Sequence, residues 1–195
     1  MNKDFAFILG NGITRLDIDC EGLLDYGYVY GCNRIYQEFA PSVLVSTDAG
    51  MAEEIQQSGY SARYTHYTRS NNKIKNSGAH VLPKEIHGYS SGPAALGLAA
   101  LSEANYLFMI GMDLKGVNNM INNIYAGTAN YKEKNAEPMY FGNWIDQINT
   151  LIQKHSNKRF MHVNPLNNFT ADEFRKNANF ETMDLTEFKR MINNL

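Results

Sequence analysis

Short polar side chains and glycines follow four apolar segments of this chain, at the points where those segments end. The four endings are Gly10-Asn11-Gly12, Gly31-Cys32-Asn33, Ser46-Thr47-Asp48 and Gly111-Met112-Asp113. Glycine lets the backbone approach a ligand closely, asparagine offers a donor and an acceptor, and aspartate accepts hydrogen bonds from sugar hydroxyls. One such ending is an ordinary strand terminus. Four of them indicate a ligand-binding site.

A further polar stretch opens the most apolar helix pattern in the chain. Ser90, Ser91 and Gly92 precede Pro93, and the residues that follow up to Ala104 are mostly small or apolar. A serine N-cap and a proline in the first turn are typical of a helix start. Because the free N–H groups and the positive end of a helix favour an anion, we expect these three residues to belong to the same site.

The Gly10-Asn11-Gly12 turn is not a dinucleotide fingerprint. That motif would have its third glycine at Arg15, then a long helix and a ribose-binding acid, and the chain shows neither. The chain also lacks the G-x-x-x-x-G-K-S/T sequence of a P-loop and the G-x-S-x-G elbow of a serine hydrolase. The turn instead fits the first wall of a mononucleotide-sugar pocket, with Arg15 outside it.

Two patterns suggest metal binding at first sight. Asp17-Ile18-Asp19 matches the D-x-D pair of metal-dependent glycosyltransferases, and His66, His80 and His87 lie in or near a tyrosine-rich segment. Apolar residues alternate with the two acids, as they do where a chain is anchored to a core, and the histidine spacing fits no metal site. We therefore expect no metal ion, and histidines that are exposed or hydrogen-bonded.

The elements that position these residues follow from the apolar periodicity. The segments that fit strands are 5–9, 26–31, 43–47, 80–83, 106–110 and 159–163. The segments that fit helices are 34–39, 49–57, 90–104, 143–155, a capping box at 170–173, and 186–195. This alternation predicts an α/β fold: a single Rossmann-like domain over residues 1–195, with a mainly parallel sheet flanked by helices and with helices at the C-terminal end. Ligands bind at the carboxyl ends of such strands.

The polar, asparagine-rich segment 116–138 separates the strand at 106–110 from the helix at 143–155. A loop of this length inside a compact domain is typical of a functional segment. We expect it to be a lid that closes over the bound ligand.

The composition excludes several classes of protein. The formal net charge is −2, which argues against a nucleic-acid partner because phosphate binding needs a basic surface. No apolar run approaches the length of a membrane span, and the apolar stretch near the N-terminus is too short for a signal peptide. We therefore expect a cytoplasmic protein in which Cys20 and Cys32 are free thiols. Its twelve tyrosines and ten phenylalanines are compatible with a homo-oligomer.

The order of the motifs resembles a known enzyme family. Along about the first two thirds of the chain run GNGITRLDID, YGCNR, STDAG, SSGPAALGLAAL, IGMDL and IYAGT. This order is similar to that of the bacterial sialyltransferases of glycosyltransferase family 42, which use CMP-sialic acid on one Rossmann-like domain. The opening turn is similar, more weakly, to that of pterin-diphosphokinase-like Rossmann proteins. The resemblance implies a metal-independent transferase with a CMP-type nucleotide-sugar donor, no cofactor, and a glycan or small-molecule acceptor.

The resemblance also implies roles for individual residues. The residues it places against the nucleotide and sugar of the donor are Gly10, Asn11, Gly12, Asn33, Asp48, Ser90, Ser91, Gly92, Gly111 and Asp113. Asp48 replaces a family asparagine. Tyr125 matches one of two tyrosines that stabilise the leaving phosphate. The other falls at Lys115, whose ammonium group could neutralise the same charge.

One catalytic position departs from the family pattern. The family's general base is a histidine shortly before the helix at 143–155, and Phe141 stands there instead. Glu137 and Tyr140 are the nearby groups that could replace it. Two other functions remain open: a diphosphokinase-like transferase that uses Mg-ATP, and a non-catalytic nucleotide-binding or structural protein, such as a phage protein, that has lost the base.

Overall fold

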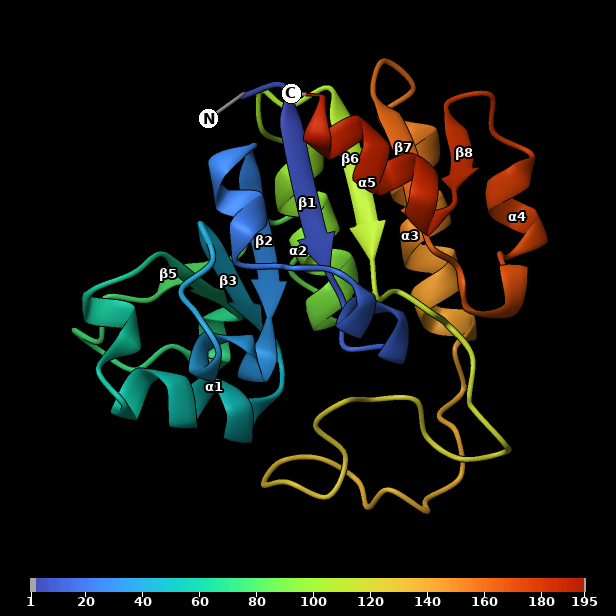
Figure 1. Ribbon diagram of the computed structural model, residues 1–195. Helices are drawn as coiled ribbons and strands as arrows, with labels where there is room; N and C mark the ends of the chain where they lie inside the picture. The colour runs from blue at the N-terminus through green and yellow to red at the C-terminus, as the bar shows by residue number, and fades with distance from the viewer. Residues whose placement is uncertain (1–2, 195) are drawn as a thin grey trace.

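The computed structural model describes residues 3–194, which form one sheet of eight strands (Figure 1). The strands are β1 (Phe5–Leu9), β2 (Tyr28–Cys32), β3 (Val43–Ser46), β4 (His66–Thr68), β5 (His80–Val81), β6 (Tyr106–Ile110), β7 (Arg159–Val163) and β8 (Phe180–Met183). Every neighbouring pair is parallel, and the order across the sheet is β5-β4-β3-β2-β1-β6-β7-β8. The predicted α/β class, with a parallel sheet flanked by helices, is confirmed.

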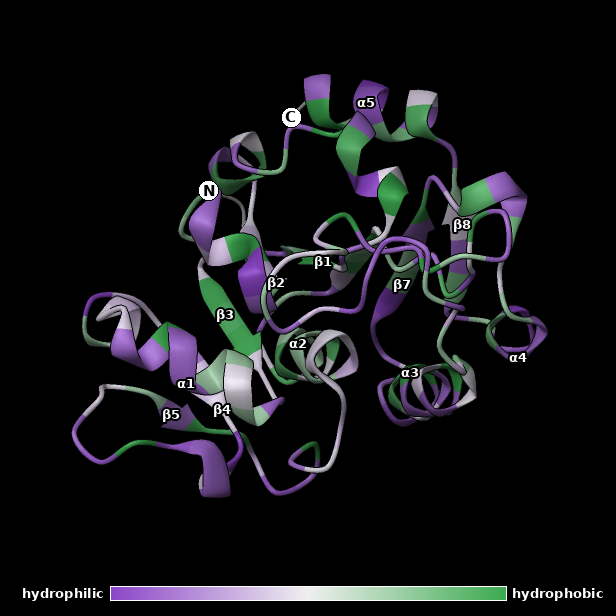
Figure 2. Ribbon diagram, turned by 90° about the horizontal axis from the view of Figure 1, so that it is seen from below, coloured by the Kyte–Doolittle hydropathy of each residue, from purple (hydrophilic) through white to green (hydrophobic). Residues whose placement is uncertain are grey.

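Helices cover both faces of this sheet. The α-helices are α1 (Ala49–Gln57), α2 (Ser91–Ala100), α3 (Gly142–Lys154), α4 (Asp172–Arg175) and α5 (Leu185–Asn193), and the 3₁₀ helices are η1 (Ile13–Asp17), η2 (Gly22–Asp25), η3 (Asn33–Gln37), η4 (Tyr60–Ala62), η5 (Ser70–Asn72) and η6 (Leu166–Asn168). Residues of α2, α3 and α4 pack on one face, and residues of α1 and α5 pack on the other. Figure 2 shows α5 and the α2–α3 pair on opposite sides of the sheet.

Side chains of the central strands alternate between these two cores. In β1, Ala6 and Ile8 pack with α2 and α3, whereas Phe7 and Leu9 pack with α1 and α5. All four side chains are completely buried. A strand has a side-chain period of two, and burial on both faces explains why β1 consists of apolar residues without a polar interruption.

The predicted bounds agree best for elements with one dominant periodicity. The strands β1, β6 and β7 and the helix α1 begin and end at the predicted residues. The predicted capping box at 170–173 is wrong. The Thr170 hydroxyl is 3.1 Å from Nδ1 of His162, and α4 follows Ala171 without a side-chain cap.

Two strands, β4 and β8, are not predicted from the sequence. β4 has three residues and begins with His66, and β8 is an edge strand whose Glu181 and Thr182 are exposed. Neither segment carries the apolar run that identifies a strand buried on both faces. Both become strands through backbone pairing with a neighbour.

The direction of the chain across the sheet reverses between β1 and β6. From β1 the chain adds β2, β3, β4 and β5 successively on one side, and then returns to add β6, β7 and β8 on the other. The connections that follow β1 and β6 therefore leave in opposite directions. In an open parallel sheet, this switch point is where ligands bind, outside the carboxyl ends of the strands.

The two cysteines are buried and free, as predicted. Burial raises the pKa of Cys20 to about 11 and that of Cys32 to about 12, so both thiols stay protonated near neutral pH. Within residues 3–194, no helix has the length and apolar character needed to traverse a bilayer.

Candidate functional site

The turns that follow β1 and β6 are joined directly through their backbones. Gly10 N donates to Ile110 O and Gly12 N donates to Gly111 O, both at 2.8 Å. A side chain at Gly10 would collide with the Gly111 carbonyl, and one at Gly12 would collide with the Asp113 carboxylate. Gly111 has a φ of 65°, which favours glycine. The structure thus places the predicted residues of these two turns side by side.

Asp113 connects this junction to two other segments. Its carboxylate is buried and accepts hydrogen bonds from the Thr14 hydroxyl, from Thr14 N at 3.3 Å and from Asn122 Nδ2 at 2.8 Å. These bonds hold η1 and segment 116–138 against the turn after β6. A contact between Asp113 and a ribose, as the resemblance implies, requires that Asn122 first give up its bond.

A small cavity of about 100 Å³, which we name the edge cavity, lies between the two turns. Predicted ligand residues that line it are Gly10, Asn11, Gly12, Gly111 and Asp113. Phe141 and Trp144, at the start of α3, form part of its wall. Sites for small molecules usually have at least about 300 Å³. The edge cavity therefore admits a nucleotide only if part of its wall moves.

Segment 116–138 is the part of the wall best placed to move. It passes below the carboxyl ends of the strands (Figure 1), and its Asn122 and Asn123 line the edge cavity. Ile124 N donates to Asn11 O, and Asn122 Oδ1 accepts from Ile13 N, both at 2.9 Å. A third, longer bond runs from Asn11 Nδ2 to Tyr131 Oη at 3.4 Å, and the residues of the segment other than Tyr125 and Ala126 are exposed or half-buried, which favours local opening.

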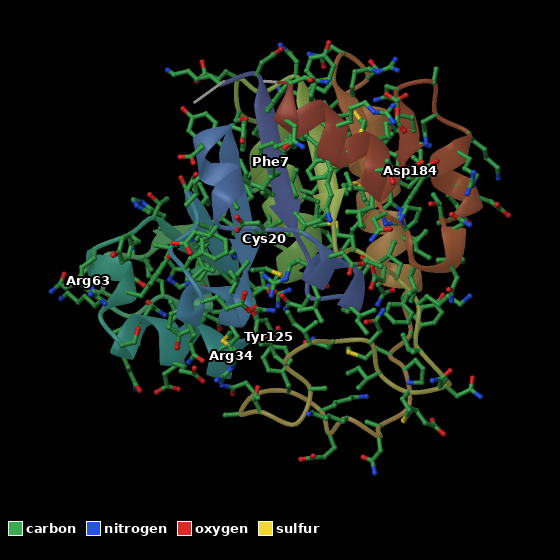
Figure 3. All side chains as sticks on the ribbon, in the orientation of Figure 1. Phe7, Cys20, Arg34, Arg63, Tyr125 and Asp184 are labelled. Atoms are coloured by element: carbon green, nitrogen blue, oxygen red, sulfur yellow. The ribbon has the colours of Figure 1, made fainter. Side chains whose placement is uncertain are left out.

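A second set of bonds attaches the same segment to α1 and η3. Arg34 Nη2 donates to Ala129 O at 3.0 Å and pairs with Glu54 Oε2 at 3.1 Å. Asn130 Nδ2 donates to the same glutamate oxygen at 2.8 Å, and Tyr131 Oη accepts from Arg34 N at 3.4 Å. These contacts keep segment 116–138 closed over the sheet edge, and Figure 3 shows Arg34 and Tyr125 together at that edge.

The residues at the start of α2 are only partly available to a ligand. Ser91 is buried, and its hydroxyl accepts from Thr47 N at 3.0 Å and bonds the Thr47 hydroxyl. Ser90 N donates to Gln147 Oε1 at 3.0 Å. Pro93 lines the edge cavity, whereas Ser90, Ser91 and Gly92 do not. The serine hydroxyl that the sequence suggests for a ligand thus joins α2 to the end of β3.

Asn33 and Asp48 lie after β2 and β3, outside the lining of the edge cavity. Asn33 has a φ of 55°, and its buried Oδ1 has no hydrogen-bond partner in the part of the chain that the structure describes. Asp48 is exposed and makes no capping bond at the start of α1. Both residues lie at the carboxyl edge of the sheet, where Asp48 is open to solvent and the Asn33 Oδ1 is buried.

Tyr125 belongs to a buried polar cluster with Arg15 and Glu38. Arg15 Nη2 donates to Glu38 Oε1 at 2.8 Å and to Tyr125 Oη at 2.9 Å, and the Tyr125 hydroxyl also donates to Glu38 Oε1. The Arg15 side chain is 2 % exposed and that of Glu38 is 44 % exposed. Arg15 Nη1 is buried without a partner among the described residues. The buried guanidinium of Arg15 therefore holds the Glu38 carboxylate in place, and this carboxylate reaches solvent.

The electrostatics of this cluster keep Arg15 charged and Tyr125 neutral. Burial alone would lower the pKa of Arg15, but the neighbouring Tyr125 and Glu38 outweigh it and raise that pKa. Burial raises the pKa of Tyr125, and Glu38, which needs the phenol proton for its hydrogen bond, raises it further against the opposing effect of Arg15. Tyr125 therefore acts as a hydrogen-bond donor and not as a base.

The remaining predicted catalytic residues are not brought together. The Lys115 ammonium lies 5.4 Å from the centre of the Phe169 ring, outside the edge cavity. Glu137 is exposed, and Tyr140 is 81 % exposed. Neither Glu137 nor Tyr140 lines the edge cavity, whereas Phe141 does. Phe141, which stands where the resembled family has a histidine, therefore lines the site, and the two predicted substitutes for that histidine do not.

A larger cavity of about 490 Å³, which we name the outer cavity, lies between η1 and segment 116–138. Its lining includes Glu38, Tyr125 and Lys134. Asn122 and Asn123 line both the outer and the edge cavity. The two cavities are therefore neighbours that share one wall. Tyr125 faces the outer one.

Sequence reasoning missed several residues that organise this region. These residues are Arg15, Thr14, Glu38 and Asn122. No local sequence pattern predicts their contacts, because the contacts of the first three join residues 23 to 110 positions apart and Asn122 lies in the asparagine-rich loop. The one available signal is Arg15 itself, a charged residue three positions after the last glycine of a strand-end turn.

Neither a cluster of metal ligands nor a relative identifies the site. Among residues 3–194, no group of three or more His, Cys, Asp or Glu side chains is arranged to hold a metal ion. Comparisons with protein-family models, with curated proteins and with solved structures found no match to this chain. The fold and site define a parallel α/β protein with adjoining cavities at the sheet edge, and its function has to be argued from those cavities.

Proposed function

We propose that this protein binds a nucleotide-sugar of the CMP type at its edge cavity and acts as a glycosyltransferase. The observation that carries the proposal is the convergence of the Gly10–Gly12 turn and the Gly111–Asp113 turn at the β1–β6 switch point. Their glycines let a phosphate approach the backbone, and Asp113 offers a carboxylate to sugar hydroxyls. The order of motifs in the sequence supports the CMP-sugar as donor.

Binding in this site is coupled to movement of segment 116–138. The edge cavity of about 100 Å³ has to enlarge, and release of the Asn122 and Asn11 contacts exposes Asp113 and the Gly10–Gly12 turn. The segment then closes again over the donor, which excludes water from the reacting centre. Asp48 is exposed at a neighbouring strand end and completes the nucleotide contacts, together with Asn33 once movement of the segment uncovers its buried Oδ1.

Calorimetric titration with CMP, CDP, UDP, GDP and AMP, with and without Mg²⁺, tests the proposal. We expect the cytidine nucleotides to bind more tightly than the others, and to do so without Mg²⁺. We expect Asn11→Ala to weaken cytidine binding by about tenfold through a lost hydrogen bond. The matched control is Asn71→Ala, an exposed asparagine on η5.

The other outcomes contradict the proposal in different ways. If AMP or ATP binds only with Mg²⁺, the diphosphokinase-like alternative is favoured. If no nucleotide binds, the structural alternative is favoured. If cytidine nucleotides bind equally well to the wild type and to Asn11→Ala, the nucleotide site lies elsewhere.

One observation favours the non-catalytic alternative. Lys115, Glu137 and Tyr140 do not line the edge cavity, and Phe141 stands where the resembled family has its base. Incubation with CMP-sialic acid separates the two cases, because a catalytic site releases CMP and a binding protein leaves the donor intact. Release of CMP that is lost in Asn11→Ala supports transfer chemistry at the edge cavity.

A further inference from the structure

The outer cavity has the properties of a second ligand site. Its volume of about 490 Å³ falls in the range of sites that take small molecules. Its lining is apolar on most sides, from η1 and from segment 116–138: Ile13, Leu16, Val117, Met120, Ile121 and Ile124. Ile13 is 44 % exposed, Leu16 65 % and Met120 39 %. These side chains leave apolar surface in water, and an apolar ligand would cover it.

One end of this cavity is polar and rigidly held. Glu38 Oε1 already accepts bonds from Arg15 and Tyr125, whereas Glu38 Oε2 accepts no hydrogen bond from the part of the chain that the structure describes. The buried Arg15 restrains the carboxylate of this cavity-lining residue, so a ligand that bonds the free oxygen causes little further loss of side-chain freedom. Lys134, the cation in the lining, is exposed. Among the side chains that line the cavity, the charged group that is held in place is therefore the Glu38 carboxylate.

We propose that the outer cavity binds an apolar molecule that carries one hydroxyl or amino group, with that group donating a hydrogen bond to Glu38 Oε2. The apolar body packs against the exposed side chains of η1 and of segment 116–138. A ligand with a carboxylate at the same end would place two negative charges together, so it is disfavoured. We therefore expect the site to bind ligands whose polar group donates a hydrogen bond, and not simple carboxylic acids.

The position of the outer cavity gives this ligand a role if the edge cavity binds a donor. Asn122 and Asn123 form the wall between the two cavities. Segment 116–138 lines both cavities, so the movement that the donor requires also reshapes the outer cavity, and displacement of Asn122 and Asn123 as the segment closes again joins the two spaces. The molecule in the outer cavity is then the acceptor, an apolar alcohol or amine in place of a glycan. This last step rests on the proposed function, whereas binding to the outer cavity does not.

The test uses three probes of one shape and different end groups: 4-phenylbutan-1-ol, 4-phenylbutylamine and 4-phenylbutanoate. Each is titrated into the full chain without nucleotide, and backbone amide shifts are followed by NMR. We expect the alcohol and the amine to shift amides of residues 13–16 and 117–126, and to bind at least about tenfold more tightly than the carboxylate.

Glu38→Gln is the variant that addresses the anchoring carboxylate. It keeps the shape of the side chain and removes its charge, and we expect it to weaken the amine by about tenfold and to abolish the preference for amine over carboxylate. Glu85→Gln is the matched control, because Glu85 is exposed and lines neither cavity. Leu16→Asp is a second variant, at a side chain that is 65 % exposed, and it should weaken the alcohol without affecting the fold.

Three results would overturn the proposal: equal binding of the carboxylate and the amine, shifts confined to other parts of the chain, or Glu38→Gln and Leu16→Asp both binding as the wild type does. Each concerns probes in the absence of nucleotide. Failure here therefore leaves the nucleotide titration unaffected, and failure of the nucleotide titration leaves the outer cavity as a ligand site without a donor.

Discussion

Arg15 shows how one residue can have a role that its sequence position hides. It occupies the place of a fingerprint glycine, yet its side chain turns inward and supports Glu38 and Tyr125. A buried guanidinium persists only with partners, because an unpaired charge in the interior is strongly unfavourable. The pairing also determines the state of Tyr125, which stays protonated beside the glutamate. The hydrogen bonds of Tyr125 and Glu38 at the sheet edge thus depend on a residue outside the predicted motif.

Replacement of the buried Arg15 should lower the free energy of unfolding more than replacement of an arginine in an exposed ion pair. Arg15→Met keeps the volume but removes two hydrogen bonds, and we expect the free energy of unfolding to fall by about 1–3 kcal/mol, a range reduced because Glu38 is partly exposed. Arg159→Met breaks a pair in which both side chains are 50 % exposed, and should cost about 0.5 kcal/mol or less. Urea unfolding measures both. Equal losses would show that Arg15 contributes no more than a surface arginine.

His66 makes stability depend on pH. Its ring lies fully buried between the hydroxyls of Ser46 at 2.8 Å and Ser61 at 2.7 Å. Burial, together with nearby His80, lowers the pKa of His66 to about 4 from its usual 6.5. The unfolded chain therefore binds a proton more readily than the folded one between these two values. Stability is complete above pH 6.5 and declines as the pH falls towards 4.

We expect the free energy of unfolding to fall by about 2–4 kcal/mol from His66 alone between pH 7 and pH 4. His162, whose pKa burial also lowers to about 4, should add a similar decline. Urea unfolding of the wild type and of His66→Gln at pH 7, 5.5 and 4.5 checks this. A decline of equal steepness in both proteins would contradict the role assigned to His66.

Segment 116–138 has no regular secondary structure over most of its length, and its closed position depends on side chains from other elements. Glu54 of α1 is the centre of one attachment, because it pairs with Arg34 and accepts from Asn130 Nδ2 and from the Tyr36 hydroxyl. The backbone bonds within the segment include turn bonds such as Tyr131 N to Thr128 O, and its residues other than Tyr125 and Ala126 are exposed or half-buried. Such a segment opens at a small fraction of the global free energy of unfolding.

Glu54→Ala should therefore loosen the segment without unfolding the sheet. The amides of Gly127, Thr128 and Tyr131, which are bonded within the segment, should exchange their hydrogens about five- to tenfold faster. Glu53→Ala is the matched control, because the neighbouring Glu53 is exposed and bonds only Gln57 among the described residues. Hydrogen exchange followed by mass spectrometry provides the measurement. Unchanged exchange in Glu54→Ala would show that the segment is held by its other contacts.

An element from the C-terminal part of the chain packs on the first strand and contributes to the core. The C-terminal helix α5 packs over the central strands β1 and β6 (Figure 1). Its Phe188 lies 6.2 Å from Phe7 and 5.8 Å from Phe108, measured between ring centroids, and all three rings are buried. The helix therefore completes the core on one face of the sheet that carries the site.

Phe188→Ala should lower the free energy of unfolding by about 3–5 kcal/mol, because it removes a buried ring and leaves a cavity against β1 and β6. Thr186→Ala, at an exposed position of the same helix, should change it by less than about 0.5 kcal/mol. Denaturant unfolding compares the two. Similar small losses would mean that α5 contributes little to the central core.

Local patterns predicted the fold because the central strands obey one simple rule. A strand buried on both faces has to be apolar throughout, so β1, β6 and β7 are visible in the sequence with correct bounds. The alternation of strands and helices predicted a parallel sheet, whereas the order of its strands, and with it the convergence of the β1 and β6 turns, came only from the tertiary structure. β4 and β8 escaped prediction because backbone pairing with a neighbour, and not apolar content, makes them strands.

The sequence alone predicted which residues lie in the glycine turns, because each belongs to a motif that ends a strand. Which of them face a cavity was decided only by packing: Ser91 binds Thr47, and Tyr140 points to solvent while Phe141 lines the site. The Arg15–Glu38–Tyr125 cluster joins residues up to 110 positions apart, and no local pattern records such a contact. Strand ends are specified by neighbours along the chain, whereas cavities are specified by neighbours in space.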